Sequence, residues 1–91
     1  MLVEKVEETI ADLAKHDVRK HKKVIKCLGF LEQDPKYPSL ASTRYQTMYS
    51  ATVEPIWESY VENHLPSAWR VWWFYGPEDG EITVVDLGPH P

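Results

Sequence analysis

Apolar residues recur every three or four positions near the start of the chain, which is the spacing of one face of a helix. The first stripe consists of Val3, Val6, Ile10 and Leu13. Acidic side chains occupy several of the positions between them. We therefore expect an amphipathic helix over roughly residues 2–16.

A second apolar stripe follows after a short interval and predicts a second helix. Asp17 precedes this helix and can cap its first turn through its carboxylate. Asp34 stands before Pro35, and a residue in that position avoids the helical region, so the helix should end there. The stripe consists of Val24, Ile25, Leu28 and Leu31. The very short connection between the two helices predicts an antiparallel helical hairpin.

The pattern changes to alternation in the second half of the chain, which is typical of β-strands. We expect a short strand over Thr43–Tyr49, a strand over residues 56–63, and two more over residues 68–75 and 81–91, joined by a turn at Gly76–Gly80. Strands that follow helices indicate an α+β fold. The predicted architecture is a two-helix antiparallel hairpin packed on one face of a twisted three- to four-stranded antiparallel sheet.

Length and composition set further limits. Ninety-one residues, 43% of them hydrophobic, fit one small domain over residues 1–91 that folds without disulfide or metal. Cys27 is the only cysteine, so it cannot form an internal disulfide, and it indicates a reduced, cytoplasmic setting. No apolar run is long enough to span a membrane, and the acidic start lacks the apolar core of a signal peptide.

The net charge of −4 is unevenly distributed, since residues 1–47 carry nine basic and seven acidic side chains, whereas residues 48–91 carry one and seven. This balance counts against simple polyphosphate binding. The run of Arg19, Lys20, His21, Lys22, Lys23 and Lys26 is either a contact surface for ribosomal RNA or an acidic partner, or the solvated face of the second helix. No histidine has a second ligand at metal spacing, so we expect neither a metal nor a cofactor.

Parity separates the two faces of the predicted sheet, because side chains alternate along a strand. Odd-numbered positions are nearly all apolar and should pack on the helices. Even-numbered positions mix charged with aromatic side chains and should form an open face. The even set consists of Glu58, Tyr60, Glu62, Arg70, Trp72, Phe74, Ile82, Val84 and Asp86. The exposed aromatics of this face favour a protein interface, with a partner or a second copy, unless the segment around residues 40–50 buries them.

Arg70 is the only Lys or Arg after position 44. A hairpin centred on Glu78 places Arg70 opposite Asp86, and the preceding turn brings Glu62 close. His90 falls on the same face, just beyond Asp86. Arg70 is thus either the centre of a site or the cation of a surface cluster with these two carboxylates, which would contribute little stability.

Taken in order, these segments resemble the RelE/ParE toxin superfamily of type II toxin–antitoxin systems over roughly residues 18–91. The segments that carry the resemblance are Leu31–Pro35, Pro38–Leu40, Trp57–Val61, Trp69–Trp73 and Gly88–Pro91. The resemblance implies two helices against a twisted antiparallel sheet. RelE-like members cut mRNA on the ribosome, ParE-like members inhibit DNA gyrase, and cognate antitoxins neutralise both.

The resemblance also implies site residues. A strand arginine that matches Arg70 contacts the scissile phosphate in the nuclease members, and a C-terminal residue loosely matched by His90 supports proton transfer. Arg44 and Tyr45 lie near positions where further site residues occur, and Tyr60 or Trp72 can stack an unpaired base.

The chain departs from the family pattern in two respects. The family usually opens with a short strand before the first helix, whereas this chain is expected to begin inside that helix. Nuclease members also bring several basic residues to the site, where this chain offers Arg70 and His90 among carboxylates. We expect a cytoplasmic toxin with a cognate antitoxin, either an mRNA endoribonuclease or a non-catalytic protein. The second class comprises a gyrase inhibitor, a degenerate family member and a homodimeric interaction module.

Overall fold

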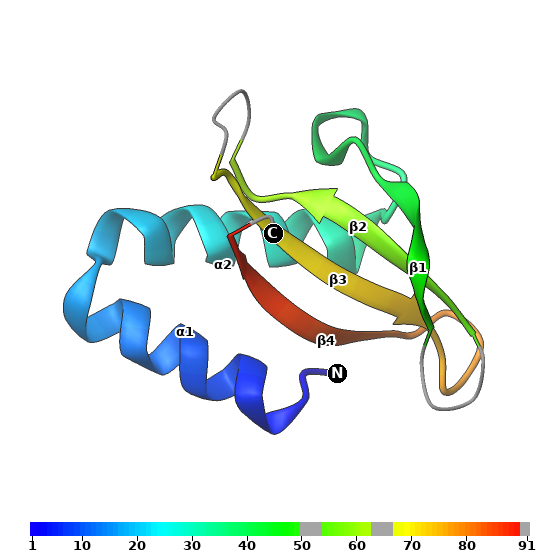
Figure 1. Ribbon diagram of the computed structural model, residues 1–91, viewed down its shortest axis with the longest axis horizontal. Helices are drawn as coiled ribbons and strands as arrows, with labels where there is room; N and C mark the ends of the chain where they lie inside the picture. Colours follow the sequence, from blue (N-terminus) through cyan, green and yellow to red (C-terminus); the bar gives the residue numbers. More distant parts are fainter. Residues whose placement is uncertain (50–53, 63–66, 90–91) are drawn as a thin grey trace.

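A helical hairpin lies against a four-stranded antiparallel sheet in the computed structural model of the chain (Figure 1). The structure describes residues 1–49, 54–62 and 67–89. The elements are α1 (Glu4–His16), α2 (Val18–Gln33), the 3-10 turn η1 (Pro38–Leu40), β1 (Thr43–Tyr49), β2 (Pro55–Tyr60), β3 (Trp69–Tyr75) and β4 (Ile82–Pro89). The strands lie in chain order, β1-β2-β3-β4. The predicted α+β architecture is therefore confirmed, with four strands.

The ends of the two helices follow from their capping residues. Asp17 alone separates α1 from α2, and its Oδ1 accepts a hydrogen bond from the backbone N–H of Lys20 at 3.1 Å. At the other end of α2, Asp34 has extended backbone before Pro35, which ends the helix at Gln33. Both capping predictions are confirmed. No helix among the described residues is long and apolar enough to cross a membrane.

The first three residues are extended and pair with β4, so α1 begins at Glu4 and not at residue 2. The backbone N–H of Val3 donates to Val84 O at 3.2 Å, and Val84 N–H donates to Met1 O at 2.8 Å. Leu2 thereby forms a parallel bridge with Val84. The expectation that the chain begins inside the helix is wrong, because this segment adds a strand-like piece to β4.

Apolar side chains from both helices meet one face of the sheet. Trp73 in β3 is fully buried at the centre of this layer. The other buried members are Val6 and Leu13 of α1, Val24, Cys27 and Leu31 of α2, Leu40 of η1, Val71 of β3, and Val84 and Leu87 of β4. The core therefore lies between the helical hairpin and β3–β4.

A chain of hydroxyl hydrogen bonds joins the sheet to the loop after α2. Trp73 Nε1 donates to Ser59 Oγ at 2.8 Å, the Ser42 and Ser59 hydroxyls lie 2.6 Å apart, and Ser42 Oγ donates to Pro35 O at 2.8 Å. Because an indole N–H can only donate and a carbonyl can only accept, Ser59 must donate to Ser42. Every hydroxyl in this relay both accepts and donates, so the buried Trp73 indole N–H has a satisfied partner.

A β-bulge in β4 changes the predicted register. Arg70 lies opposite Gly88 and Trp72 opposite Asp86, whereas Trp73 lies opposite Val84. One extra residue of β4 falls between these pairs, and such a bulge reverses the alternation of side chains beyond it. The predicted pairing of Arg70 with Asp86 is wrong, and Val84 turns into the core, where it is 2% exposed.

A second irregularity at the end of β2 redirects Glu62. The backbone N–H groups of Val61 and Glu62 both donate to Trp69 O, at 3.0 and 3.2 Å. Two residues then oppose one, so the alternation of β2 stops at Tyr60, and the predicted extension of this strand to residue 63 is wrong. Glu62 consequently points to α2 and not to the face that carries Arg70.

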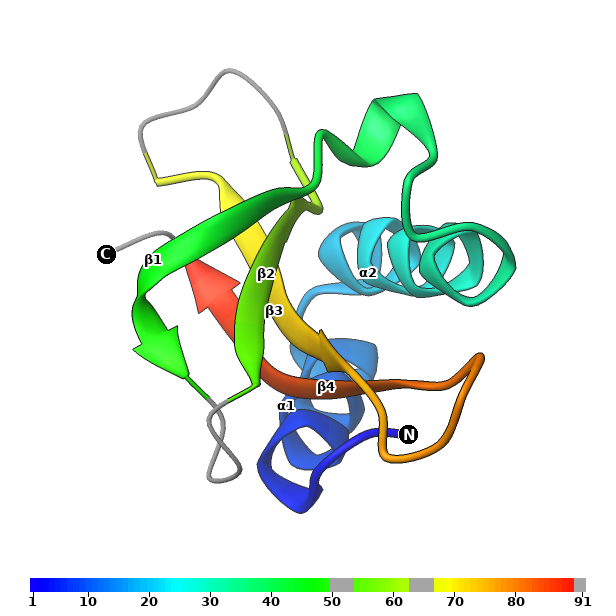
Figure 2. The same ribbon diagram turned by 90° about the vertical axis from the view of Figure 1, so that its right-hand side faces the viewer.

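The sheet is strongly twisted, and β1 runs at a steep angle to β4 (Figures 1 and 2). The pairing of β1 with β2 shifts between Tyr45 and Tyr49, which allows β1 to bend. Ile56 and Trp72 lie on the face away from the helices, yet they are only 1% and 4% exposed. The expectation of an open, exposed aromatic face is therefore wrong for Trp72.

Candidate functional site

Arg70 lies in β3, directly opposite Tyr60 of β2, on the sheet face away from the helices. The Cζ atom of its guanidinium lies 3.7 Å from the centroid of the Tyr60 ring. At that distance the cation contacts the electron-rich face of the ring, which favours a flat, stacked guanidinium. Tyr60 therefore fixes the plane of the Arg70 head group.

Glu58 supplies the ionic partner of Arg70. Its Oε1 lies 2.7 Å from Arg70 Nη1, and its Oε2 accepts a hydrogen bond from Trp72 Nε1 at 3.0 Å. The two charged side chains are only 14% and 8% exposed. Sequence reasoning expected a surface cluster of Arg70 with Glu62 and Asp86. Arg70 instead forms a buried ion pair with Glu58. Removal of one partner of such a pair strongly lowers stability, because the other charge is left buried and unpaired.

One donor of Arg70 has no partner. Among the described residues, Arg70 Nε is the only buried side-chain nitrogen or oxygen atom without a hydrogen bond. Leaving such a donor unpaired costs about 1–3 kcal/mol, and native proteins keep few of them. The guanidinium thus has its orientation fixed through Nη1 and its ring contact while one N–H remains unused.

Arg70, Glu58, Tyr60 and Trp72 form the Arg70 cluster. Tyr45 belongs to it as well, and Arg44 does not. The Tyr45 ring meets Trp72 edge-on, with centroids 6.1 Å apart. Arg44 pairs with Trp57 of β2, and adjacent residues of a strand point to opposite faces, so Arg44 projects on the other side of the sheet from Arg70. Arg44 is exposed there. The structure therefore brings together Arg70, Tyr60, Trp72 and Tyr45 of the predicted site.

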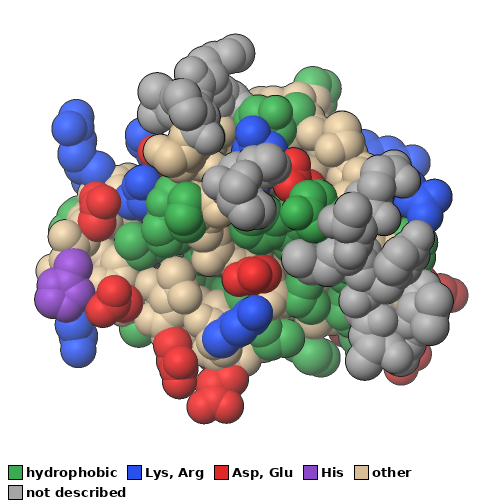
Figure 3. Space-filling view, in the orientation of Figure 1, with side chains coloured by type: hydrophobic (Ala, Val, Ile, Leu, Met, Phe, Trp, Pro, Cys, Tyr) green, Lys and Arg blue, Asp and Glu red, His purple; other side chains and the backbone are tan. Residues whose placement is uncertain are grey.

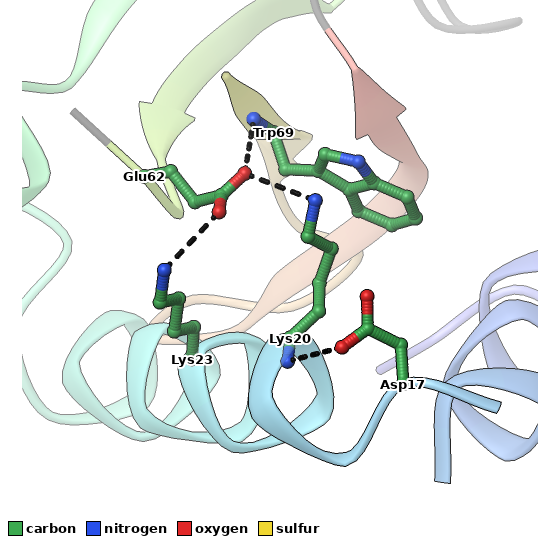
Figure 4. Close-up of polar contacts among 5 residues, drawn as sticks. All are labelled: Asp17, Lys20, Lys23, Glu62 and Trp69. Atoms are coloured by element: carbon green, nitrogen blue, oxygen red, sulfur yellow. Dashed lines mark hydrogen bonds and ion pairs between the residues drawn. The ribbon is translucent and has the colours of Figure 1, made fainter. Parts of the chain in front are cut away.

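Glu62 occupies a separate polar cluster between the sheet and α2 (Figure 4). Its carboxylate lies 3.3 Å from the ammonium groups of both Lys20 and Lys23, and it accepts the backbone N–H of Trp69 at 3.1 Å. Burial raises the pKa of Glu62, but the hydrogen bonds from Trp69, Lys23 and Lys20 outweigh burial, so the pKa is lowered from its ordinary value. Glu62 therefore links the start of β3 to α2 through these polar contacts.

The other two expected neighbours of Arg70 also fall elsewhere. Asp86 Oδ2 lies 3.7 Å from Lys5 of α1, and its Oδ1 accepts the backbone N–H of Leu87. His90 lies outside the described residues. The supporting carboxylate of the Arg70 site is therefore Glu58, and neither predicted carboxylate takes that role.

Sequence parity places Glu58 on the face of Arg70, but it does not identify the two as partners. The diagonal contact depends on the register Tyr60–Arg70 and Glu58–Trp72. That register is set by the connection between β2 and β3, whose length alone does not reveal the bulge at residues 61 and 62. The spacing of Glu58 and Tyr60, two residues apart on one strand, is the signal that could have suggested a shared partner.

Cys27 is a core thiol and not a reactive group. Its Sγ donates to Tyr60 O at 3.5 Å, and burial raises the pKa of the Cys27 thiol to about 12. A thiol with so high a pKa carries almost no nucleophilic thiolate near neutral pH. Cys27 therefore serves as a small residue of the core.

The surface on the side away from α2 carries acidic and basic side chains interspersed, without a continuous basic area (Figure 3). Within the part of the chain that the structure describes, no group of three or more His, Cys, Asp or Glu residues could hold a metal ion.

Comparisons with known proteins identify no relative of this chain. No protein-family model matches it, no curated protein matches it, and no solved structure matches it. The Arg70 cluster and the fold that positions it are consequently the basis for assigning a function.

Proposed function

We propose that this chain is the toxin of a type II toxin–antitoxin system, of the RelE/ParE kind, and that it cleaves mRNA on the ribosome through Arg70. The order of a helical hairpin followed by a four-stranded antiparallel meander supports this proposal. The extended segment before α1, which pairs with β4, also supports it, because the family usually opens with a short strand.

The observation that carries the proposal is the guanidinium of Arg70, whose orientation is fixed by the Tyr60 ring and by Glu58. Cleavage of RNA by its own 2′-hydroxyl needs stabilisation of a phosphorane that gains negative charge. Guanidinium N–H groups bind phosphate oxygens with well-defined geometry. An arginine that is already fixed by Glu58 and Tyr60 needs little further ordering to do so.

Proton transfer is assigned to His90 in this proposal. An imidazole titrates near neutral pH and can serve as general acid or base.

Among the aromatic neighbours of Arg70, Tyr45 and Tyr60 are half-buried and Trp72 is buried. Stacking of an unpaired base is therefore proposed for Tyr45, with Trp72 supporting Glu58.

The partners in this proposal are a cognate antitoxin and the ribosome with its mRNA, so the protein acts in the cytoplasm. The basic face of α2 is a candidate contact for an acidic antitoxin segment. Its residues Lys20 and Lys23 already pair with Glu62, which leaves Arg19, Lys22 and Lys26 without an ion pair to any described residue.

One observation favours a second candidate, a non-catalytic toxin of the gyrase-inhibiting kind or a degenerate family member. The Glu58 carboxylate lies 2.7 Å from Arg70 and lowers the net charge that a phosphate meets. An arginine committed to such a pair can serve the sheet alone. If this candidate is right, growth arrest requires a folded chain but does not require that the cation at position 70 is an arginine.

Inducible expression in a bacterium tests the proposal. We expect expression of the natural chain to arrest growth and to leave cut mRNA. Arg70→Lys keeps the positive charge but loses the planar set of donors, so cells that express it should grow normally with intact mRNA. The exchange Lys36→Arg at an exposed site is the control and should arrest growth as the natural chain does. Harmless accumulation of the folded natural chain contradicts the toxin proposal. Growth arrest with intact mRNA and altered DNA supercoiling favours the second candidate.

A further inference from the structure

One side of the helical hairpin faces the sheet, and its other side faces solvent (Figure 2). Val18 and Ile25 of α2 are 55% and 46% exposed, and Ala11 and Ala14 of α1 are exposed as well. These four residues fall outside the buried stripes with which the two helices pack on the core. Apolar side chains that gather on one surface between charged residues are typical of a protein interface.

The two helices carry opposite net charge. The exposed acidic side chains of α1 are Glu4, Glu7, Glu8 and Asp12, against two lysines. Helix α2 carries five Lys or Arg residues and one carboxylate. If two copies met through their hairpins with α1 on α1, like charges would face each other. The charges therefore favour an arrangement in which α1 of each copy lies on α2 of the other.

A two-fold axis that runs parallel to the hairpin produces this arrangement, and it fixes which residues meet. Such an axis preserves the position along the helices, so residues equally far from the connection at Asp17 face each other. Glu8 and Lys26 are each nine residues from Asp17, or about 14 Å along the helix. Asp12 and Lys22 are each five residues from it. Opposite charges therefore meet at two heights, and the symmetry forms each pair twice.

The apolar residues fit the same arrangement. Ala11 of α1 lies within about 3 Å of the height of Ile25 in α2, and Ala14 lies within about 3 Å of the height of Val18. Small side chains on one helix leave room for the larger side chains of the helix that packs on it, so the two copies can approach closely. The apolar contact is thus enclosed by the charged pairs.

Glu8 and Lys26 are available for this contact. Both are exposed, and neither forms an ion pair with another residue in the part of the chain that the structure describes. The Lys26 ammonium lies 5.9 Å from the centroid of the Phe30 ring on its own helix. Lys15 and Arg19, each two residues from Asp17, meet with like charge, but both are exposed and can turn toward water.

We propose that this chain associates with a second copy through the helical hairpin, in a two-fold dimer in which α1 of each copy packs on α2 of the other. Glu8 then pairs with Lys26 of the other copy. This inference goes beyond the proposed function and does not depend on it. Since the exposed basic residues of α2 are also the proposed contact for an antitoxin segment, the dimer is a state of the free chain, and the antitoxin competes with it.

Sedimentation of the purified full chain tests whether the dimer exists. The face is small, so we expect a weak dimer, with the mass of one chain at about 10 μM and of two chains at about 1 mM, in about 50 mM salt. Raising the salt to about 0.5 M should shift the equilibrium toward the monomer, because the ion pairs at the edge of the contact are screened. A chain that stays monomeric over this whole range overturns the inference.

Exchange of charge between the helices tests the arrangement of the two copies. Glu8→Lys and Lys26→Glu each place like charges opposite each other in both contacts, so each variant alone should dimerise at least roughly tenfold more weakly than the natural chain. An equal mixture of the two variants should recover the dimer. In the mixed dimer the new cation at position 8 meets the new carboxylate at position 26, and the natural Glu8 and Lys26 form the other pair.

The control Lys36→Glu makes the same charge change as Lys26→Glu at an exposed residue beyond the end of α2, and it should dimerise as the natural chain does. Circular dichroism checks that all variants are folded, which is expected because the changed side chains are exposed. Undiminished dimerisation of the two single variants, or a mixture that associates no better than either variant alone, overturns the proposed contact.

Discussion

Glu58 lies 2.7 Å from Nη1 of Arg70, and this ion pair is the electrostatic centre of the sheet face away from the helices. Its burial changes what a substitution at Arg70 does. Removal of the guanidinium leaves a buried carboxylate without its cation, whereas removal of both charges leaves two groups that can hydrogen-bond to each other. The pair therefore has to be tested as a unit.

A double-mutant cycle measures this coupling. We expect Arg70→Gln alone to lower the free energy of unfolding by about 3–5 kcal/mol, because Glu58 is then buried and unpaired. The double variant Glu58→Gln/Arg70→Gln should recover about 2 kcal/mol of that loss. Urea denaturation of the four proteins checks this. Additive effects of the two changes would mean that the pair does not interact in solution.

The matched control is Glu8→Gln/Lys15→Gln, which also removes one charge of each sign but at exposed positions of α1. We expect its free energy of unfolding to stay within about 0.5 kcal/mol of the natural chain. A loss comparable to that of Arg70→Gln would show that general charge effects, and not the buried pair, govern stability.

The lowered pKa of Glu62 predicts a loss of stability in acid. A carboxyl group whose folded pKa lies below its unfolded pKa stabilises the fold above the unfolded value and ceases to do so as the pH falls through the folded value. Melting temperatures of the natural chain should therefore decline as the pH falls below the ordinary value of 4.5 for Glu62. Glu62→Gln should cost about 1–2 kcal/mol at neutral pH and show a weaker decline in acid. If the melting temperatures of the natural chain and of Glu62→Gln declined equally in acid, the Glu62 carboxylate would not be the source of the pH dependence.

The hydroxyl relay predicts an unusually large effect of a small substitution. Ser59→Ala removes one oxygen but leaves the buried indole N–H of Trp73 without its acceptor at 2.8 Å. We expect a loss of about 2–3 kcal/mol in the free energy of unfolding. Ser67→Ala, at an exposed serine, is the control and should have little effect. Equal stability of the two variants would show that Trp73 does not depend on Ser59.

The buried thiol predicts slow chemical modification. With the pKa of Cys27 at about 12, the folded chain should react with a thiol-specific reagent more than about a thousandfold more slowly than the chain in denaturant. The time course of modification at mildly alkaline pH measures this ratio. Similar rates in both conditions would place Cys27 in contact with solvent.

Patterns local to one element were predictable from the sequence. The stripes of α1 and α2, the cap at Asp17 and the stop at Asp34 each depend on a few neighbouring residues whose chemistry is unambiguous. The Thr43–Tyr49 strand likewise followed from composition and alternation. Two local expectations are wrong. Ile25, which was counted in the apolar stripe of α2, is 46% exposed. The segment before Glu4 is extended, and its pairing with Val84 links the two ends of the described chain.

Features that depend on register were not predictable. The bulge between Val84 and Asp86 inserts one residue, and so do the two N–H groups that share Trp69 O. Nothing in the alternation of residue types marks either insertion. They decide which carboxylate meets Arg70. Parity alone correctly placed Glu58 on the same face as Arg70. It could not show that Glu58, and neither Glu62 nor Asp86, is the neighbour of Arg70, because the register decides which residues of adjacent strands lie side by side.

Ribosome-dependent cleavage by purified proteins tests the central claim, that Arg70 is oriented for phosphate chemistry and does not merely hold the sheet together. The natural chain, Glu58→Gln/Arg70→Gln and the control Glu8→Gln/Lys15→Gln are compared on translating ribosomes, with circular dichroism confirming that all three are folded. The account predicts mRNA cleavage by the natural chain and the control and none by the folded Glu58→Gln/Arg70→Gln protein. Cleavage by that double variant, or intact mRNA with the natural chain, would contradict it.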